Sequence, residues 1–448
     1  MQITANQPPK GGAGPRVTDI AAPLCAAELQ SALARLGAPR RAILAVSGGP
    51  DSMALARLAA QGAAAGGGDV LAVTVDHRLR PGSRAEAEQA GRWCRAAGLA
   101  HRILAWEGPK PSTGIQAAAR AERYRLLAGL AAGEGYDAIL TAHTAGDQAE
   151  TVFMRLARGA GPRGLAGMEA RIMIAAGPLE PVLLLRPFLE FPRARIIATL
   201  DAFGQDFIAD PSNDDPGFER VRTRALLAAL AEKGLLTTEA LWRTAARMRA
   251  AAARLEASEN AFFEEAGGAF GDHGWASLAQ GEENPPPPGL IARLIRAVGG
   301  GDHLPAEDAA AGALAAATEG RAASLGGAIL KKARGRLTIY REPAAVLGRA
   351  GLAPLAPASV PPGGAILWDG RFIIANQREG PLAVAPIGEG APGRELAVAL
   401  GVPPGAVQAA PAIVDAQGAA SLAAADAPGL TVQSLAAERF SGRTLRFH

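Results

Sequence analysis

Four short apolar runs alternate with helix-like segments between residue 41 and about residue 158. Short apolar runs bounded by turn residues predict buried strands, whereas apolar residues spaced three and four positions apart predict helices. Repeated strand–helix units predict an α/β fold with a doubly wound parallel sheet, because helices that connect parallel strands cover both of its faces. The predicted strands are RAILAV, DVLAVTV, HRILAW and YDAILTA, and the helices after them begin near residues 52, 83, 116 and 147.

The pattern changes after residue 158. Few strand signals follow between residues 186 and 227, and an Ala- and Arg-rich stretch over residues 237–258 predicts a connecting helix with one apolar face. Prolines at 285–288 mark a break before a second helix at 290–298. The segment SLGGAILKKARGRLTIYREP predicts a hairpin, and AILWDGRFII is the one strand-like core of the region after it.

A length of 448 residues predicts two or three domains. We expect an N-terminal extension and first helix over residues 1–37, a parallel-sheet domain over 38–228, a mostly helical middle domain over 229–345 and a small C-terminal β-containing domain over 346–448.

Arginine dominates the basic residues. Five of the 46 are lysines, the net charge is +3 and the pI is near 9.1. Arginine suits bidentate phosphate contacts, although a GC-rich coding sequence would give the same bias. The pI permits a nucleic-acid partner without requiring one.

The two cysteines, Cys25 and Cys94, form no CxxC pair, so neither a disulfide framework nor a zinc knuckle is indicated. The first residues hold no apolar signal region, and later uncharged stretches are broken by Pro and Gly. We therefore expect a soluble protein of the reducing cytoplasm that has no membrane partner.

The segment SGGPDS joins the first predicted strand to the first predicted helix and has the composition of a phosphate-binding loop. Gly48 and Gly49 allow a tight turn, so backbone N–H groups and the helix N-terminus can converge on one anion. Asp51 beside bound phosphates suits a Mg²⁺ ligand, because Mg²⁺ prefers oxygen ligands and bridges phosphates. The alternative is an ordinary turn in which Asp51 or Ser52 caps the helix.

The sequence does not support two other phosphate-binding motifs, the Walker A loop and the dinucleotide-binding GxGxxG loop. A Walker A loop needs Lys followed by Ser or Thr, and none of the five lysines is followed by either. Gly159, Gly161 and Gly164 spell GxGxxG, but the segment before them is helical in pattern, whereas a dinucleotide site needs a strand there.

Polar residues also follow the second and fourth predicted strands. The carboxyl ends of parallel strands meet at one edge of a sheet, so the loops that hold His77 and His143 can converge on the loop at Ser47. Asp147 and Glu150 lie three residues apart, on one face of the helix after His143. Their alternative role is to complement the dipole of that helix.

Arg120, Arg123 and Tyr124 share one face of another predicted helix. Solvated arginines are the default interpretation. If they face the site, their guanidinium groups would offset the charge of an adenylate or pyrophosphate.

Taken in order, these segments resemble the tRNA(Ile)-lysidine synthetases, a branch of the N-type (PP-loop) ATP pyrophosphatases. The likeness covers residues 41–227, weakens over the last hundred residues, and makes residues 38–228 the ATP pyrophosphatase domain. It rests on SGGPDS, DHRLRPGSRAEA, AARAERYR, TAHTAGDQAET, RGAGPRGLAGM, LLRPFL and DPSNDDPGFERVRTR.

The resemblance implies that ATP and Mg²⁺ activate the wobble cytidine of a tRNA(Ile) with a CAU anticodon, and that L-lysine then replaces AMP. It implies ATP contacts from Ser47, Gly48, Gly49, Pro50, Asp51, Ser52, Asp76, His77 and His143, with Asp51 also on the metal. It implies catalytic roles for Asp51, Arg120, Arg123, Asp147 and Arg224, lysine contacts from Asp147 and Glu150, and tRNA contacts from Arg220, Arg222 and Arg224. It is also compatible with a homodimer.

The chain departs from the family pattern at two positions in these segments. Gly146 stands where the family often has Asp, and Val221 replaces a frequent Asn. Three rival functions differ in what they need: a PP-loop tRNA thiolase needs grouped cysteines, a nucleotide sensor needs no catalytic carboxylates, and an amidating ligase needs a glutamine-hydrolysing domain.

Overall fold

The computed structural model describes residues 22–66, 68–209, 215, 217–281, 284–351, 353–414, 420–422, 428–442 and 444–447. The chain divides into two compact units, of which unit 1 comprises residues 1–105, 140–154 and 185–242, and unit 2 comprises residues 106–139, 155–184 and 243–448. The predicted domain boundaries stay predictions, and residues 1–21 of the predicted extension lie outside the described residues.

Unit 1 is built on parallel strands. β1 pairs in parallel with β2, with Arg41 opposite Asp69, and β2 pairs in parallel with β3. The strand order β4-β1-β2-β3 means that the chain runs outward from β1 to β3 and returns to the other side of β1, so the predicted doubly wound α/β class is confirmed. The strands of unit 1 are β1 (Arg41–Ala45), β2 (Asp69–Asp76) and β3 (Ala100–Ala105). Strand β4 (Ala138–Leu140) lies at the boundary, with Leu140 in unit 1 and its first two residues in unit 2.

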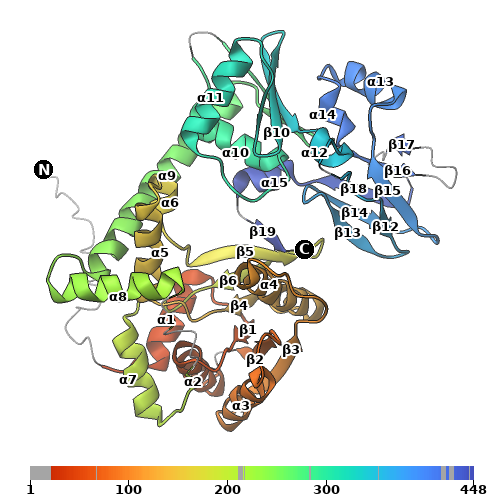
Figure 1. Ribbon diagram of the computed structural model, residues 1–448. Coiled ribbons are helices and arrows are strands. Elements are labelled where there is room, and N and C mark those ends of the chain that lie inside the picture. The colour runs from red at the N-terminus through yellow and green to blue at the C-terminus, as the bar shows by residue number, and fades with distance from the viewer. Residues whose placement is uncertain are drawn as a thin grey trace, which may run out of the picture. The chain divides into compact units, whose positions relative to one another are not determined.

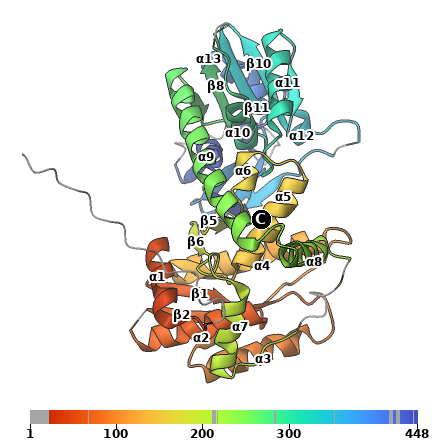
Figure 2. The same ribbon diagram turned by 90° about the vertical axis from the view of Figure 1, so that its left-hand side faces the viewer.

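Helices cover the strands of unit 1 (Figure 1). More than half of the residues of α2 are buried. It packs against α1, α3 and α7, which lie around β1 and β2 in Figure 2. The helices are α1 (Ala26–Leu36), α2 (Pro50–Ala64), α3 (Ser83–Ala96), α5 (Ala145–Ala157), α7 (Arg193–Phe203) and α8 (Glu219–Glu232). Helix α2 begins two residues before the predicted start, because Pro50 takes the first helical position and Gly49 the N-cap.

The first part of unit 2 contains strands that the sequence pattern missed. β5 pairs in parallel with β19, so residues far apart in the chain complete one piece of sheet. Both strands are short, and β5 shows no clear apolar alternation. The elements are α4 (Ile115–Glu134), α6 (Pro162–Leu165), β5 (Arg171–Ala176), β6 (Val182–Leu185) and β19 (Thr444–Phe447).

The region predicted to be a mostly helical middle domain also holds a five-stranded antiparallel sheet in the order β7-β8-β11-β10-β9. The predicted hairpin is its centre, with β10 paired to β11. Helix α10 begins at the predicted proline break and buries almost every side chain against this sheet and α11. The elements are α9 (Thr238–Glu265), α10 (Pro288–Val298), α11 (Glu307–Thr318), β7 (Ala269–Gly271), β8 (Trp275–Ala279), β9 (Ala323–Leu325), β10 (Ala328–Ala333) and β11 (Arg336–Arg341).

The segment predicted to be one strand-like core is a hairpin of two strands, β13 and β14. Asp369 and Gly370 both have positive φ, 47° and 64°, which allows the tight turn between them. The strands of this last region form one sheet of four and one of three. They are β12 (Ala358–Val360), β13 (Ala365–Trp368), β14 (Phe372–Asn376), β15 (Leu382–Pro386), β16 (Pro411–Val414), β17 (Ala420–Leu422) and β18 (Leu430–Ser434).

Four short helices accompany these strands, namely α12 (Ala344–Leu347), α13 (Ala391–Leu400), α14 (Gly405–Gln408) and α15 (Ala436–Ser441). Within the described ranges, no helix of either unit combines the length and apolar character needed to cross a membrane.

Candidate active site

The loop from Ser47 to Ser52 is closed by its own serines. The Ser52 hydroxyl donates to the Gly49 carbonyl at 2.9 Å and accepts the Ser47 N–H at 3.2 Å. The Ser47 hydroxyl in turn accepts the Gly49 N–H at 3.4 Å. Because the N-cap of α2 is a glycine, no cap side chain covers the first N–H groups of this helix. These N–H groups and the positive end of the helix dipole form a suitable site for an anion.

Gly48 is the residue of this loop that has a positive φ angle. Its φ is +83°, a value that favours glycine, and an added Cβ would lie 2.5 Å from Ile208 Cδ1. The Gly48 carbonyl accepts the Ile208 N–H at 2.9 Å. Ile208 therefore anchors the loop from the segment after α7, a contact that no motif in the sequence signals.

Replacing Gly48 with Ala is expected to lower the free energy of unfolding by about 1–3 kcal/mol, because it adds backbone strain and displaces Ile208. The KM for ATP should rise in the same variant. Thermal unfolding and ATP titration measure the two effects. Gly49→Ala is the control for stability, since Gly49 has φ −71° and its added Cβ would make only an ordinary contact with Ser47. Equal losses of stability in both variants would contradict this account of the loop.

Asp51 lies in the first turn of α2 and is largely buried. Its Oδ1 lies 3.9 Å from Arg193 Nε and has no hydrogen-bond partner among the described residues. Burial raises the pKa of Asp51 to about 6, against the effect of Arg193 and with a contribution from the nearby charge of Asp147. Nothing in the sequence points to Arg193, because a single arginine at the start of a helix carries no distinguishing signal.

A buried carboxylate oxygen that lacks a hydrogen-bond partner among the described residues fits a hard cation such as Mg²⁺. In the part of the chain that the structure describes, no three His, Cys, Asp or Glu side chains gather into a metal-binding cluster. Mg²⁺ is commonly held by one or two carboxylates together with phosphate oxygens and water, so Asp51 can serve as its protein ligand.

Asp147 caps the helix that carries it. Its Oδ2 accepts the Thr144 N–H at 2.8 Å and the Thr144 hydroxyl at 3.0 Å, and its own N–H donates to Thr144 Oγ1 at 3.4 Å. This reciprocal pattern is a capping interaction at the start of α5. The alternative structural role of Asp147 is therefore present, whatever else the residue does.

Glu150, one turn further along α5, is only 4% exposed and pairs with the arginines of α8. Its Oε1 accepts Arg224 Nε at 2.8 Å, and its Oε2 lies 3.8 Å from Arg220 Nε. Burial raises the pKa of Glu150, and the hydrogen bond from Arg224 opposes the rise. Burial would by itself lower the pKa of Arg224, but its bond to Glu150 raises that pKa overall.

The structure thus brings Asp51, Asp147, Glu150 and Arg224 close enough for their charges to influence one another. Arg222 differs from its two neighbours, since its Nη1 donates to the Gly217 carbonyl at 2.9 Å. The residues just before α8, 210–214 and 216, lie outside the described residues, although they belong to a segment on which the resemblance rests.

The second strand ends at Asp76, which is 3% exposed. Its Oδ1 accepts the Arg78 N–H at 3.0 Å and the Ser83 hydroxyl at 2.8 Å, whereas Oδ2 has no hydrogen-bond partner among the described residues. A hollow of about 660 Å³ opens here, lined by Asp76 and residues 78–84. His77 follows directly on Asp76 and is partly buried.

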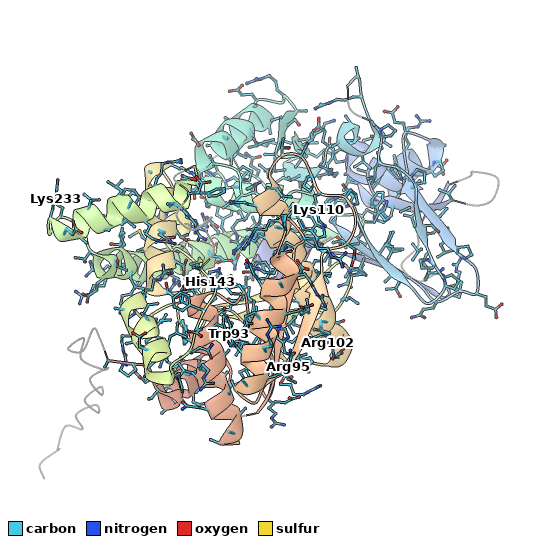
Figure 3. All side chains as sticks on the ribbon, turned by 60° about the horizontal axis from the view of Figure 1, so that its bottom comes forward. Trp93, Arg95, Arg102, Lys110, His143 and Lys233 are labelled. Carbon is cyan, nitrogen blue, oxygen red and sulfur yellow. The ribbon has the colours of Figure 1, made fainter. Side chains whose placement is uncertain are left out.

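His143 follows β4 and precedes α5 in the chain. Its side chain is labelled in Figure 3. Its Nδ1 is 3.0 Å from the Thr141 hydroxyl, so Thr141 orients the imidazole ring. The predicted roles of His77 and His143 beside a nucleotide stay predictions.

Arg120 and Arg123 lie on α4, in unit 2, on the shared face that the spacing predicts. Their guanidinium carbons lie 5.0 and 5.1 Å from the ring centroid of Tyr124, which is 2% exposed. Both contacts are cation–π interactions with a buried ring. The role of either arginine in a reaction stays a prediction.

Comparisons with known proteins find one family model and several close relatives of this chain. The model of the PP-loop domain family matches residues 24–230. A Methylobacterium nodulans protein named tRNA(Ile)-lysidine synthase is 44% identical over 346 residues, which cover 73% of this chain and 98% of that protein. Proteins of the same name from Methylobacterium sp. strain 4-46 (44% identical, 67% of this chain and 89% of that protein) and Rhizobium meliloti (37% identical, 76% and 74%) also match.

Proposed function

Because the chain belongs to the tRNA(Ile)-lysidine synthase family, we propose that it is the ATP-dependent ligase that joins L-lysine to the wobble cytidine of a tRNA(Ile) with a CAU anticodon. The observation that supports this best is an arrangement within unit 1. The loop at Ser47–Ser52, with the largely buried Asp51 after it, lies close to the ion pair of Glu150 and Arg224.

In the first step, the 2-carbonyl oxygen of the cytidine attacks the α-phosphorus of ATP and pyrophosphate leaves. The N–H groups around Gly48 and Gly49 and the N-terminus of α2 would bind the phosphates. The Oδ2 of Asp76, which has no hydrogen-bond partner among the described residues, can accept a hydrogen bond from a ribose hydroxyl. Mg²⁺, held by Asp51, would neutralise charge on the departing pyrophosphate.

In the second step, the ε-amine of lysine attacks carbon 2 of the cytidine, and AMP leaves with the former carbonyl oxygen. The amine must first lose a proton, and a carboxylate with a raised pKa is a better acceptor for it. Glu150 has such a carboxyl group, and its Oε2 makes no hydrogen bond among the described residues. We propose that the lysine amine binds near Oε2 of Glu150, with Asp147 beside it. We further propose that Arg220, Arg222 and Arg224 bind phosphate groups of the tRNA.

A tRNA thiolase that passes sulfur through cysteines is the nearest rival, and the thiols of this chain do not suit it. Cys25 is exposed and Cys94 is fully buried. Burial raises the pKa of Cys94 to about 11, so its thiol stays protonated and unreactive near neutral pH. Both cysteines are free, which fits a reducing cytoplasm as the place of the reaction.

The test is to incubate the protein with ATP, Mg²⁺, labelled lysine and transcribed tRNA(Ile) that carries CAU. We expect acid-stable label in the tRNA and one equivalent of pyrophosphate, and neither with a U-for-C wobble control. Pyrophosphate without label would retain the PP-loop chemistry but exclude lysine as the acceptor. Light scattering on the same sample tests whether the protein is a homodimer.

A further inference from the structure

Arg193 is the first residue of helix α7 and lies beside Asp51, in the same compact unit. Helix α7 packs against α2, whose first turn carries Asp51 (Figure 2). Arg193 Nε lies 3.9 Å from Asp51 Oδ1, which is too long for a hydrogen bond, and the two side chains are 47% and 28% exposed. The contact therefore satisfies none of the N–H donors of Arg193, and its guanidinium group is half exposed beside the loop at Ser47–Ser52.

The position of Arg193 is unfavourable for the helix that carries it. A cation in the first turn lies at the positive end of the helix dipole, and the first turn of α7, with the sequence RARI, contains no acidic residue. Arg195, in the same turn, stabilises the fold. It donates to both carboxylate oxygens of Glu28, at 2.9 and 3.0 Å, and to the Ala22 carbonyl at 2.9 Å. The 3.9 Å contact of Arg193 contributes far less, and a residue that breaks a local rule without such a gain points to a role in function.

Two sources of positive potential meet at Asp51. The N-cap of α2 is Gly49, so the first N–H groups of this helix can bind an anion, and Arg193 reaches the same turn. A guanidinium group binds two phosphate oxygens at once. A divalent cation on Asp51 would cancel the charge that now attracts Arg193 and would itself repel the guanidinium group. Phosphates held by the α2 N–H groups would then be the nearest anion for Arg193.

We propose that Arg193 binds the β- and γ-phosphates of ATP and stabilises the departing pyrophosphate, and that it pairs with Asp51 only in the free protein. In this step the cytidine oxygen forms a bond to the α-phosphorus. The bond from the α-phosphorus to the oxygen that bridges to the β-phosphorus breaks, and its electron pair leaves on pyrophosphate. Negative charge therefore grows where a guanidinium group can offset it. The choice of this anion rests on the proposed ligation.

Calorimetry with inorganic pyrophosphate tests the inference without tRNA or lysine, and with EDTA present no divalent cation takes part. We expect Arg193→Gln to weaken pyrophosphate binding about 10–100-fold, the range for a lost hydrogen bond between charged groups. Arg193→Lys keeps the charge but not the paired N–H donors, so its affinity should lie between those of Arg193→Gln and the wild type. In a single turnover with ATP and tRNA, Arg193→Gln should release pyrophosphate about 10²-fold more slowly, with the KM for lysine unchanged.

Arg195→Gln is the matched control, because it removes an arginine from the same turn of α7 that is bound to Glu28. We expect this variant to have a lower Tm and the wild-type affinity for pyrophosphate. Equal affinities of Arg193→Gln and the wild type would overturn the inference, and so would an equal loss of affinity in Arg195→Gln. The binding measurement stays separate from the proposed function. If the tRNA gains no label but Arg193→Gln still binds pyrophosphate more weakly, the ligation is wrong and the anion contact of Arg193 stands.

Discussion

Replacing Asp51 with Asn is expected to reduce lysidine formation by about 10²–10³-fold, while the ligand-free protein becomes more stable above pH 6. Activity falls because the amide is a poor ligand for Mg²⁺ and cannot offset its charge beside the phosphates. Stability rises because a buried carboxylate that has no hydrogen-bond partner among the described residues is costly when ionised.

The pKa of Asp51 sets the pH range of this effect. Its value rises from 3.8 to about 6 on folding, so the folded protein retains a proton that the unfolded chain releases. The stability that Asp51 contributes is therefore lost as pH rises from about 4 to about 6, and the cost stays constant above that range. A shift of this size corresponds to at most about 3 kcal/mol, of which we expect about 1–2 kcal/mol because the side chain is 28% exposed.

Thermal unfolding of the wild type and Asp51→Asn between pH 4 and 8 measures the difference. The two curves should coincide near pH 4 and separate toward pH 6, with the variant more stable. Asp69→Asn is the control, because the Asp69 side chain is exposed and its ion pair with Arg41 lies at the surface. Equal stability of variant and wild type at pH 7 would contradict a cost of ionising the Asp51 carboxyl group in the folded protein.

Arg224→Gln is expected to lower the free energy of unfolding by about 1–3 kcal/mol and to reduce activity strongly. The loss of stability arises because Glu150, 4% exposed, would keep its charge without its 2.8 Å partner. The range lies below that of a fully buried pair, since the side chain of Arg224 is 42% exposed.

A double-mutant cycle separates the pair from its neighbours. Glu150→Gln combined with Arg224→Gln should recover part of the stability that Arg224→Gln loses, because the buried charge is gone. Arg222→Gln is the control for stability, since Arg222 lies on the same helix and bonds to the Gly217 carbonyl. Purely additive losses would mean that the pair contributes no coupling energy. Glu150→Gln alone should raise the KM for lysine.

Local pattern predicted those parts of the molecule in which neighbours in sequence are neighbours in space. The strand, turn and helix around Ser47–Ser52 form as expected, as do the shared face of Arg120 and Arg123 and the hairpin of β10 and β11. Helices α2 and α5 both begin two residues before their predicted starts. Pro50 sets the first turn of α2, and the capping interaction between Thr144 and Asp147 sets that of α5.

The sequence pattern did not predict contacts between segments that are distant in the chain. Nothing in the sequence links Glu150 to Arg224, Gly48 to Ile208, or Asp51 to Arg193. The first pair meets only when α5 and α8 pack, and the other two meet only when α7 and the segment after it pack against α2. The strands β5 and β19 were not predicted for the same reason, because they pair with each other across most of the chain's length.

The pairing of β19 with β5 also has a consequence for synthesis of the protein on the ribosome. Met173 in β5 pairs with Thr444, which is synthesised roughly 270 residues later. Until then, the edge of β5 that pairs with β19 has no partner strand. At the usual rate of translation that delay is on the order of tens of seconds. Throughout it, the nascent chain presents the open hydrogen-bonding groups of β5, which is the kind of edge that other strands add to. Crowded polysomes and slow codons after residue 176 are therefore expected to favour aggregation of this protein, and early engagement by a chaperone to counter it.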